Sequence, residues 1–239
     1  MTSTKLWGPL VGLEILSGTL GILGYQWITA NPALHAVWPW ILARATGLGA
    51  YGLLTVVVLL GMGISHPRWK RVLAKYAFGW HRTLTLGVFA LIAIHGTALA
   101  LDPYAHVSWP GLVIPGLSHY RPLAVGLGVV SAEGLLFIAV TAHLGQNWGR
   151  IKWITWHRGT LVMWTMTMFH SLWSGTDTRW MALFYEATTV LVGCVALLRY
   201  GTDRMPRLVA VRSSQNAVGS HRVPSFQAAD ERDVREHLE

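Results

Sequence analysis

Four histidines in two apolar stretches are the residues of this sequence best suited to chemistry. The tripeptide Trp-His-Arg occurs twice, and its histidines are His81 and His157. Each copy opens an apolar run that ends at a further histidine, His95 in the first and His170 in the second. Histidine is the commonest metal ligand among side chains and also exchanges protons near neutral pH. The pattern therefore indicates either metal ligation or proton transfer inside apolar segments.

The composition of the chain is typical of a helical membrane protein that crosses the bilayer several times. Of the 239 residues, 52% are hydrophobic and 13% are charged, whereas a soluble domain carries about 25% charged residues. The net charge of +8 does not indicate nucleic-acid binding, because the basic residues gather in short connections beside apolar segments. The single cysteine, Cys194, excludes an internal disulfide and an iron–sulfur site.

Six apolar segments are long enough to cross a bilayer, which takes roughly 20 residues. We therefore expect an all-α bundle of six transmembrane helices over residues 1–200, followed by a polar, disordered tail over 201–239. The expected spans are residues 7–29, 39–64, 79–101, 122–145, 152–174 and 179–200.

Lysine and arginine predict the orientation of these spans. They gather in the connection 65–78, just before the fifth span and at the start of the tail, whereas the intervening loops hold few. Basic connections face the cytoplasm, so we expect a multi-pass protein of the cell (inner or plasma) membrane with both termini cytoplasmic. The connection 65–78 could also dock an acidic partner or a flavin reductase, although topology alone explains its charge.

On this topology the histidines lie at two depths of the third and fifth helices. His81 and His95 are 14 residues apart, which is roughly 21 Å and about 3.9 turns, so both side chains face one way. Facing histidines on the fifth helix would complete two stacked sites, each suited to six-coordinate haem iron. His157 and His170 are 13 residues apart, which leaves them roughly 140° out of phase on an ideal helix. The fifth helix must therefore contain a distortion, such as a π-bulge.

The histidine spacing resembles that of the ferric reductase-like transmembrane domain superfamily. This superfamily includes ferric reductases, NADPH oxidases and MsrQ-like haem subunits. The unequal steps of 14 and 13 residues match the family, and the stretch ARATGLGAYGLLTVVVLLGMGIS on the second helix is similar as well. The resemblance covers residues 40–200. It implies two b-type haems, or one, with His81 and His157 as the inner ligands and His95 and His170 as the outer ones.

Three arginines are candidate partners for haem propionates, which are anionic. Arg82 and Arg158 directly follow the inner ligands, although both also suit an ordinary positive-inside role. Arg44 lies within an apolar span, where a charge costs at least ~2.5 kcal/mol at mid-bilayer, so we expect a propionate or bound anion beside it. Trp164 and Phe89 lie midway between the two levels, where an aromatic ring could shorten an electron path or simply pack.

The remaining polar residues of the spans give weaker signals. Glu14, Glu133 and Glu186 suit a proton relay, a quinone site or snorkelling to the interface. His143, at the cytoplasmic end of the fourth helix, is the substitute ligand if the fifth helix provides none. The histidines in or near the outer loops, which could guide a metal ion or simply be solvated, are His35, His106 and His119.

These residues lead to the hypothesis of a di-haem membrane protein that carries electrons from a cytoplasmic donor to an outer acceptor. The chain has no dinucleotide fingerprint and no soluble flavin domain. The donor would therefore be a separate flavin or NAD(P)H reductase or a quinol, with any flavin supplied by the partner or weakly bound. Ferric iron, oxygen and a periplasmic redox partner are the acceptors that the resemblance implies. NADPH oxidases have a further histidine where this chain has Leu99, which weakens superoxide production as the purpose.

A different class of function remains open on the same residues. A six-helix transporter could move protons or metal ions along the intramembrane histidines and Glu133, since ionisable groups inside a membrane often mark ion pathways. It would be colourless, and its transport would depend on pH. The haem protein would instead act as the transmembrane electron-transfer component of an oxidoreductase.

Overall fold

The computed structural model describes residues 19, 21–66, 69–144, 150–175 and 178–201. This part of the chain is helical throughout apart from its connections, and it contains no strand. The chain divides into two compact units, Met1–Val195 and Ala196–Glu239, and the four histidines belong to the first. The tail expected from residue 201 lies outside the described residues, except for Gly201. The helices are α2 (Pro32–Ser65), α3 (Lys70–Leu101), η1 (Pro110–Leu112), α4 (Pro122–Leu144), α5 (Arg150–Arg158), α6 (Thr160–Ser174) and α7 (Thr178–Gly201).

Four helices of the described part are long and apolar enough to cross a membrane, as a membrane protein requires. They correspond to the second, third, fourth and sixth expected spans. Most of the first expected span, 7–29, lies outside the described residues. The fifth expected span, 152–174, corresponds to α5 and α6, which are separated by the single residue Gly159, so this span contains the kind of distortion that the histidine spacing required. The four spans are Pro32–Ser65, Ala77–Leu101, Pro122–Leu144 and Arg179–Gly201.

The long helix α2 begins at a cap that the sequence provides. The side chain of Asn31 accepts hydrogen bonds from the backbone N–H groups of Ala33 and Leu34, at 3.1 Å and 3.4 Å, and Pro32 occupies the first turn. At the other end the chain becomes extended at His66. The helix that follows, α3, already begins at Lys70, so the basic residues expected in a loop over 65–78 partly occupy the first turns of α3.

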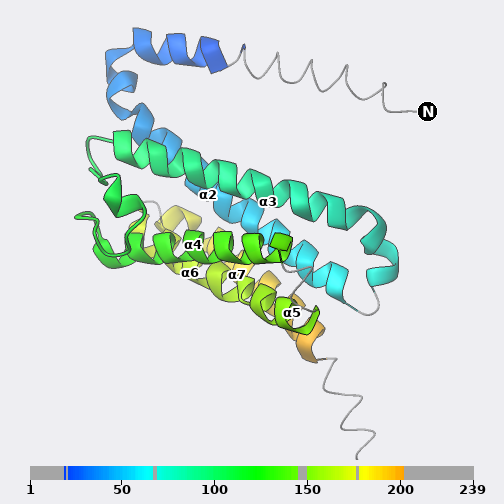
Figure 1. The fold of residues 1–239 in the computed structure, drawn as a ribbon. Helices are drawn as coiled ribbons and strands as arrows, with labels where there is room; N and C mark the ends of the chain where they lie inside the picture. The colour runs from blue at the N-terminus through cyan, green and yellow to red at the C-terminus, as the bar shows by residue number, and fades with distance from the viewer. Residues whose placement is uncertain (1–18, 20, 67–68, 145–149, 176–177, 202–239) are drawn as a thin grey trace, which may run out of the picture. The chain divides into compact units, whose positions relative to one another are not determined.

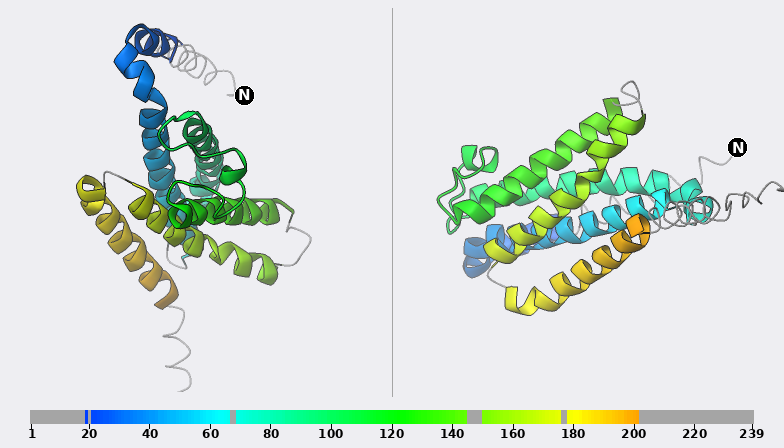
Figure 2. Two further views of the ribbon diagram at one scale, coloured as in Figure 1. Left: turned by 90° about the vertical axis from the view of Figure 1, so that its left-hand side faces the viewer. Right: turned by 90° about the horizontal axis from the view of Figure 1, so that it is seen from below.

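Two antiparallel helix pairs position the histidines. The helix α3 runs along α2, and α6 runs along α4, as Figures 1 and 2 show. Hydrogen bonds establish the antiparallel direction of the second pair. His170, near the end of α6, bonds Ala124 near the start of α4, whereas Met163, near the start of α6, bonds Ser131 farther along α4. The helix α6 also packs on α2, which brings the two pairs together.

Candidate functional site

His81 and His157, here called the first histidine pair, face each other from α3 and α5. Their ring centroids are 6.1 Å apart, and the ring planes make an angle of 62°. The Nδ1 atom of His81 lies 3.1 Å from the carbonyl oxygen of Val57 on α2. Since a carbonyl only accepts, Nδ1 carries the proton, and the lone pair is on Nε2.

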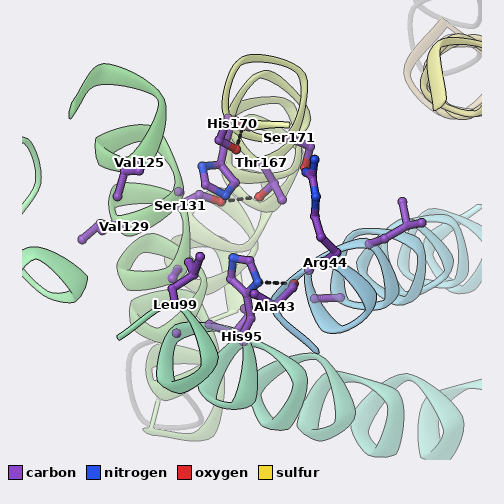
Figure 3. A pocket seen from close by; sticks show the side chains of 18 of the residues that line it. Ala43, Arg44, His95, Leu99, Val125, Val129, Ser131, Thr167, His170 and Ser171 are labelled. Carbon is purple, nitrogen blue, oxygen red and sulfur yellow. Dashed lines mark hydrogen bonds between the residues drawn. The ribbon is translucent and has the colours of Figure 1, made fainter. Parts of the chain in front are cut away.

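His95 and His170, here called the second histidine pair, face each other from α3 and α6. Their ring centroids are 6.3 Å apart, and their planes are nearly perpendicular, at 85°. Each Nδ1 donates to a backbone carbonyl at 2.7 Å, His95 to Ala43 on α2 and His170 to Ala124 on α4. Figure 3 shows both rings pointing into the space between the helices, with the bond from His95 to Ala43 dashed.

The separation of each pair matches that of two imidazoles sharing one metal atom. If the two ligating nitrogens lie on opposite sides of the metal, bonds of about 2.0 Å and ring centroids about 1.1 Å behind each nitrogen would place the centroids roughly 6.2 Å apart. Hydrogen bonding of the other nitrogen to a carbonyl is the usual second contact of a metal-ligating histidine, because it fixes both tautomer and ring orientation. The residues present therefore fit a group that needs two axial imidazoles, as haem does.

The helical geometry changes at Gly159, between the two histidines whose spacing required a distortion. The backbone N–H of Gly159 donates to the carbonyl of Trp156 at 2.9 Å, three residues back, while Gly159 keeps right-handed helical dihedrals of φ −58° and ψ −17°, so the helix tightens to a 3₁₀-type turn between α5 and α6. Such a turn changes the rotation that an ideal helix would impose between His157 and His170. The expected distortion therefore exists, but as a break between two helices rather than a π-bulge. It lets both histidines face their partners on α3.

A cavity of about 770 Å³ contains the second histidine pair. This volume is within the range of cofactor and ligand sites, about 300–1,000 Å³. Its walls come from α2, α3, α4, α6 and α7, and the connection after α3 contributes Trp109, Leu112 and Val113. Apolar residues make up most of its lining, and beside the two imidazoles the polar side chains include Arg44, Ser131 and Thr167.

Of the three arginines expected near haem, Arg44 is half-buried and the other two are exposed. It lines the cavity of the second pair, and its guanidinium carbon is 5.2 Å from the ring centroid of Trp40. Figure 3 shows its side chain directed along the cavity toward Ser171. Arg82 and Arg158 are exposed next to the histidines of the first pair, and neither lines this cavity.

Along the chain, Trp164 lies between His157 and His170, and Tyr51 and Thr55 lie between Ala43 and Val57, the α2 residues that contact His95 and His81. Trp164 on α6 is 4% exposed, and its indole N–H donates to Thr55 Oγ1 on α2 at 2.9 Å. Tyr51, fully buried, stacks on Trp164 with centroids 6.0 Å apart and hydrogen-bonds Thr188 of α7 at 2.7 Å. Trp164 therefore has the central place expected from the sequence. Phe89 is half-buried on α3.

The sequence reasoning missed several polar residues that join the helices around the site. Ser131 on α4 donates to the carbonyl of Met163 at 2.9 Å and lies 2.5 Å from Thr167 Oγ1, both on α6. Tyr51 and Thr55 were missed as well. The available signal was a hydroxyl residue inside an apolar span, where it needs a partner on a neighbouring helix or on its own backbone.

The weaker candidates stand apart from the histidine pairs. Glu133 and Glu186 are exposed, and Glu14 lies outside the described residues. His143 is exposed at the end of α4, while His157 is the residue that faces His81. Within the described ranges, no group of three or more His, Cys, Asp or Glu side chains is placed to hold a metal ion. Leu99 lines the cavity of the second pair. His106 and His119 are exposed in the connection between α3 and α4, whereas His35, expected in or near a loop, is exposed near the start of α2.

Comparisons of the chain with protein-family models, with curated proteins and with solved structures find no match.

Proposed function

We propose that the chain holds two haem b groups and passes electrons between the two faces of a membrane. The observation that carries the proposal is the facing of two imidazoles at two levels, with ring centroids 6.1 Å and 6.3 Å apart. The resemblance of the histidine spacing to ferric reductase-like transmembrane domains favours the same function. When bound, haem would supply an iron that gains and loses one electron, and two imidazole ligands would suit it to electron transfer.

In this proposal the first histidine pair holds one haem and the second pair holds the other. The carbonyl bonds of His81, His95 and His170 keep the protons on Nδ1 and leave Nε2 for ligation. The two levels are roughly 21 Å apart along α3. Trp164, packed on Tyr51, fills the region between the levels with aromatic rings and excludes water from it.

The arginines supply positive charge for the propionates. Arg44 shares the cavity of the second pair, where a propionate or another anion would offset the cost of a charge inside the membrane. Arg82 and Arg158 are exposed beside the first pair and can meet propionates from the membrane surface.

The direction of transfer follows from the charge of the connections. With both termini cytoplasmic, the first pair lies toward the cytoplasm and the second pair toward the outside. The donor is then a separate flavin or NAD(P)H reductase or a quinol, and the acceptor is ferric iron or a periplasmic redox partner. The chain acts as the transmembrane component of an oxidoreductase.

The positions of the carboxylates favour this proposal over a proton or metal-ion transporter. In a transporter of that kind the intramembrane ionisable groups face the bundle interior or a water-filled cavity. Glu133 and Glu186 are exposed, and neither lines the cavity of the second pair.

The test is haem content and redox spectroscopy of the purified full chain. Pyridine haemochrome assay should give two haems b per chain, and the reduced-minus-oxidised spectrum should show b-type bands. His81→Ala and His95→Ala should each lower the content to about one haem. His119→Ala, a change at an exposed histidine, is the matched control and should keep both. A colourless protein from cells well supplied with haem would refute the proposal.

A further inference from the structure

Three of the four histidines meet a neighbouring helix in the same way. In each case Nδ1 donates to the carbonyl of one residue, and the ring lies against a glycine four residues farther along the same helix. The sets of histidine, carbonyl residue and glycine are His95 with Ala43 and Gly47, His81 with Val57 and Gly61, and His170 with Ala124 and Gly128.

The spacing of four residues has a simple cause. In an α-helix the carbonyl of residue i accepts the N–H of residue i+4, and its second lone pair remains open beside that residue. Any side chain at i+4 would stand over this lone pair, whereas glycine leaves it accessible to a ring from another helix. We call this combination a carbonyl–glycine notch.

The closeness of the rings shows how much each notch depends on glycine. A Cβ atom added at Gly47 would lie 2.8 Å from Cε1 of His95, and one at Gly128 would lie 2.6 Å from Nδ1 of His170. Cβ atoms essentially never come that close to other heavy atoms, so each ring would have to move. A Cβ at Gly61 would lie 3.3 Å from His81, a contact that a shift of a few tenths of an ångström relieves.

The part that must give is the imidazole and not the helix. In all three notches the atoms that meet the added Cβ belong to the histidine ring, at the end of a side chain that can rotate. Rotation relieves the clash, but it breaks the bond to the carbonyl and turns Nε2 away from the opposite histidine. The fold can therefore persist while the ligand geometry is lost.

We propose that Gly47, Gly61 and Gly128 are positioning residues that set the orientation of the haem ligands. The inference rests on the proposed function and adds to it the feature that fixes each ring. It also predicts an order of sensitivity. The second histidine pair has two tight notches and depends on both, whereas the first pair has a looser one at Gly61.

The experiment compares Gly47→Ala, Gly128→Ala and Gly61→Ala in the full chain. Haem per chain and the low-spin electron paramagnetic resonance spectrum are the readouts, because the spectrum reports the orientation of the axial imidazole planes. Gly49→Ala on α2 is the matched control, since its Cβ would make an ordinary 3.6 Å contact with Leu91. The spectrum of His95→Ala assigns the signal of the second pair.

We expect Gly47→Ala and Gly128→Ala each to reduce haem from two to about one per chain, or to shift the signal of the second pair while the first stays unchanged. Gly61→Ala should retain two haems with a small shift, and Gly49→Ala should match the wild type. If one tight variant fails to fold, the other, on a different helix, decides. Two haems with unchanged spectra in the tight variants overturn the inference. A wild-type protein without haem overturns the proposed function instead.

Discussion

The hydrogen bond between Tyr51 and Thr188 allows us to predict that substitutions of its two partners destabilise the protein to different extents. The phenol of Tyr51, fully buried on α2, lies 2.7 Å from Thr188 Oγ1 on α7. The hydroxyl of Thr188 donates to the carbonyl of Tyr185 at 3.0 Å, so it accepts from the phenol. Tyr51→Phe removes the donor, and Thr188→Val removes the acceptor.

The two substitutions leave different groups behind. After Tyr51→Phe, the hydroxyl of Thr188 still donates to Tyr185, so the loss is one net hydrogen bond of about 0.5–1.5 kcal/mol. Bonds of this kind in membrane proteins average about 0.6 kcal/mol. After Thr188→Val, the buried phenol keeps a donor with no acceptor, which costs about 1–3 kcal/mol. We therefore expect Thr188→Val to destabilise the protein by roughly 1 kcal/mol more than Tyr51→Phe.

Reversible unfolding in mixed micelles with increasing denaturing detergent measures both free energies. The double variant closes a cycle, and it should be about as stable as Tyr51→Phe alone, because it leaves no stranded donor. A larger loss for Tyr51→Phe than for Thr188→Val, or strictly additive losses in the double variant, would contradict the assigned donor and acceptor.

Three further predictions concern the histidine pairs. His143→Ala should leave two haems per chain in the pyridine haemochrome assay, whereas His157→Ala should lower the content to about one. Equal haem losses in the two variants would contradict the pairing of His157 with His81. Gly159→Ala would put a Cβ 2.9 Å from the carbonyl of Trp156, so the turn must shift. We expect a loss of about 1–2 kcal/mol in unfolding free energy and a changed paramagnetic signal from the first pair; an unaltered protein would show that the break is not required. Arg44→Gln should lower the midpoint potential of the second-pair haem by tens of millivolts, on the order expected for one partly screened charge, because positive charge favours ferrous iron. A potentiometric titration checks this, and an unchanged potential would place the charge elsewhere.

The sequence predicted the elements that carry chemistry better than it predicted their details. Apolar runs define four spans that the structure contains, because length and hydrophobicity alone decide whether a helix can cross a bilayer. The pairing of His81 with His157, and of His95 with His170, followed from equal depths on two helices. Those depths depend only on helical rise, which every residue shares.

The position of the helix break and the contacts of the rings could not be predicted in the same way. A distortion between His157 and His170 followed from their spacing, but Gly159 is one of 25 glycines, and glycine within a helix is common in membrane spans. Hydrogen bonds from histidine to backbone carbonyls cannot be predicted from residue type, because every residue has a carbonyl. Only the glycine beside each carbonyl marks them, and its meaning depends on which helix lies opposite.

The glycine spacing on α2 nevertheless carries information once the antiparallel pairing is known. Gly47 and Gly61 are 14 residues apart, as are His81 and His95, and each step is about 3.9 turns. Because α2 and α3 are antiparallel and the two 14-residue steps are equal, the glycine face of α2 and the histidine face of α3 contact each other at two levels. A carbonyl–glycine notch therefore lies opposite a histidine at each level. The step of 13 residues from His157 to His170 does not return both side chains to one helix face in this way. The second half of the bundle therefore needs a distortion to match the first, and the change of helical geometry at Gly159 lies in the right place to provide it.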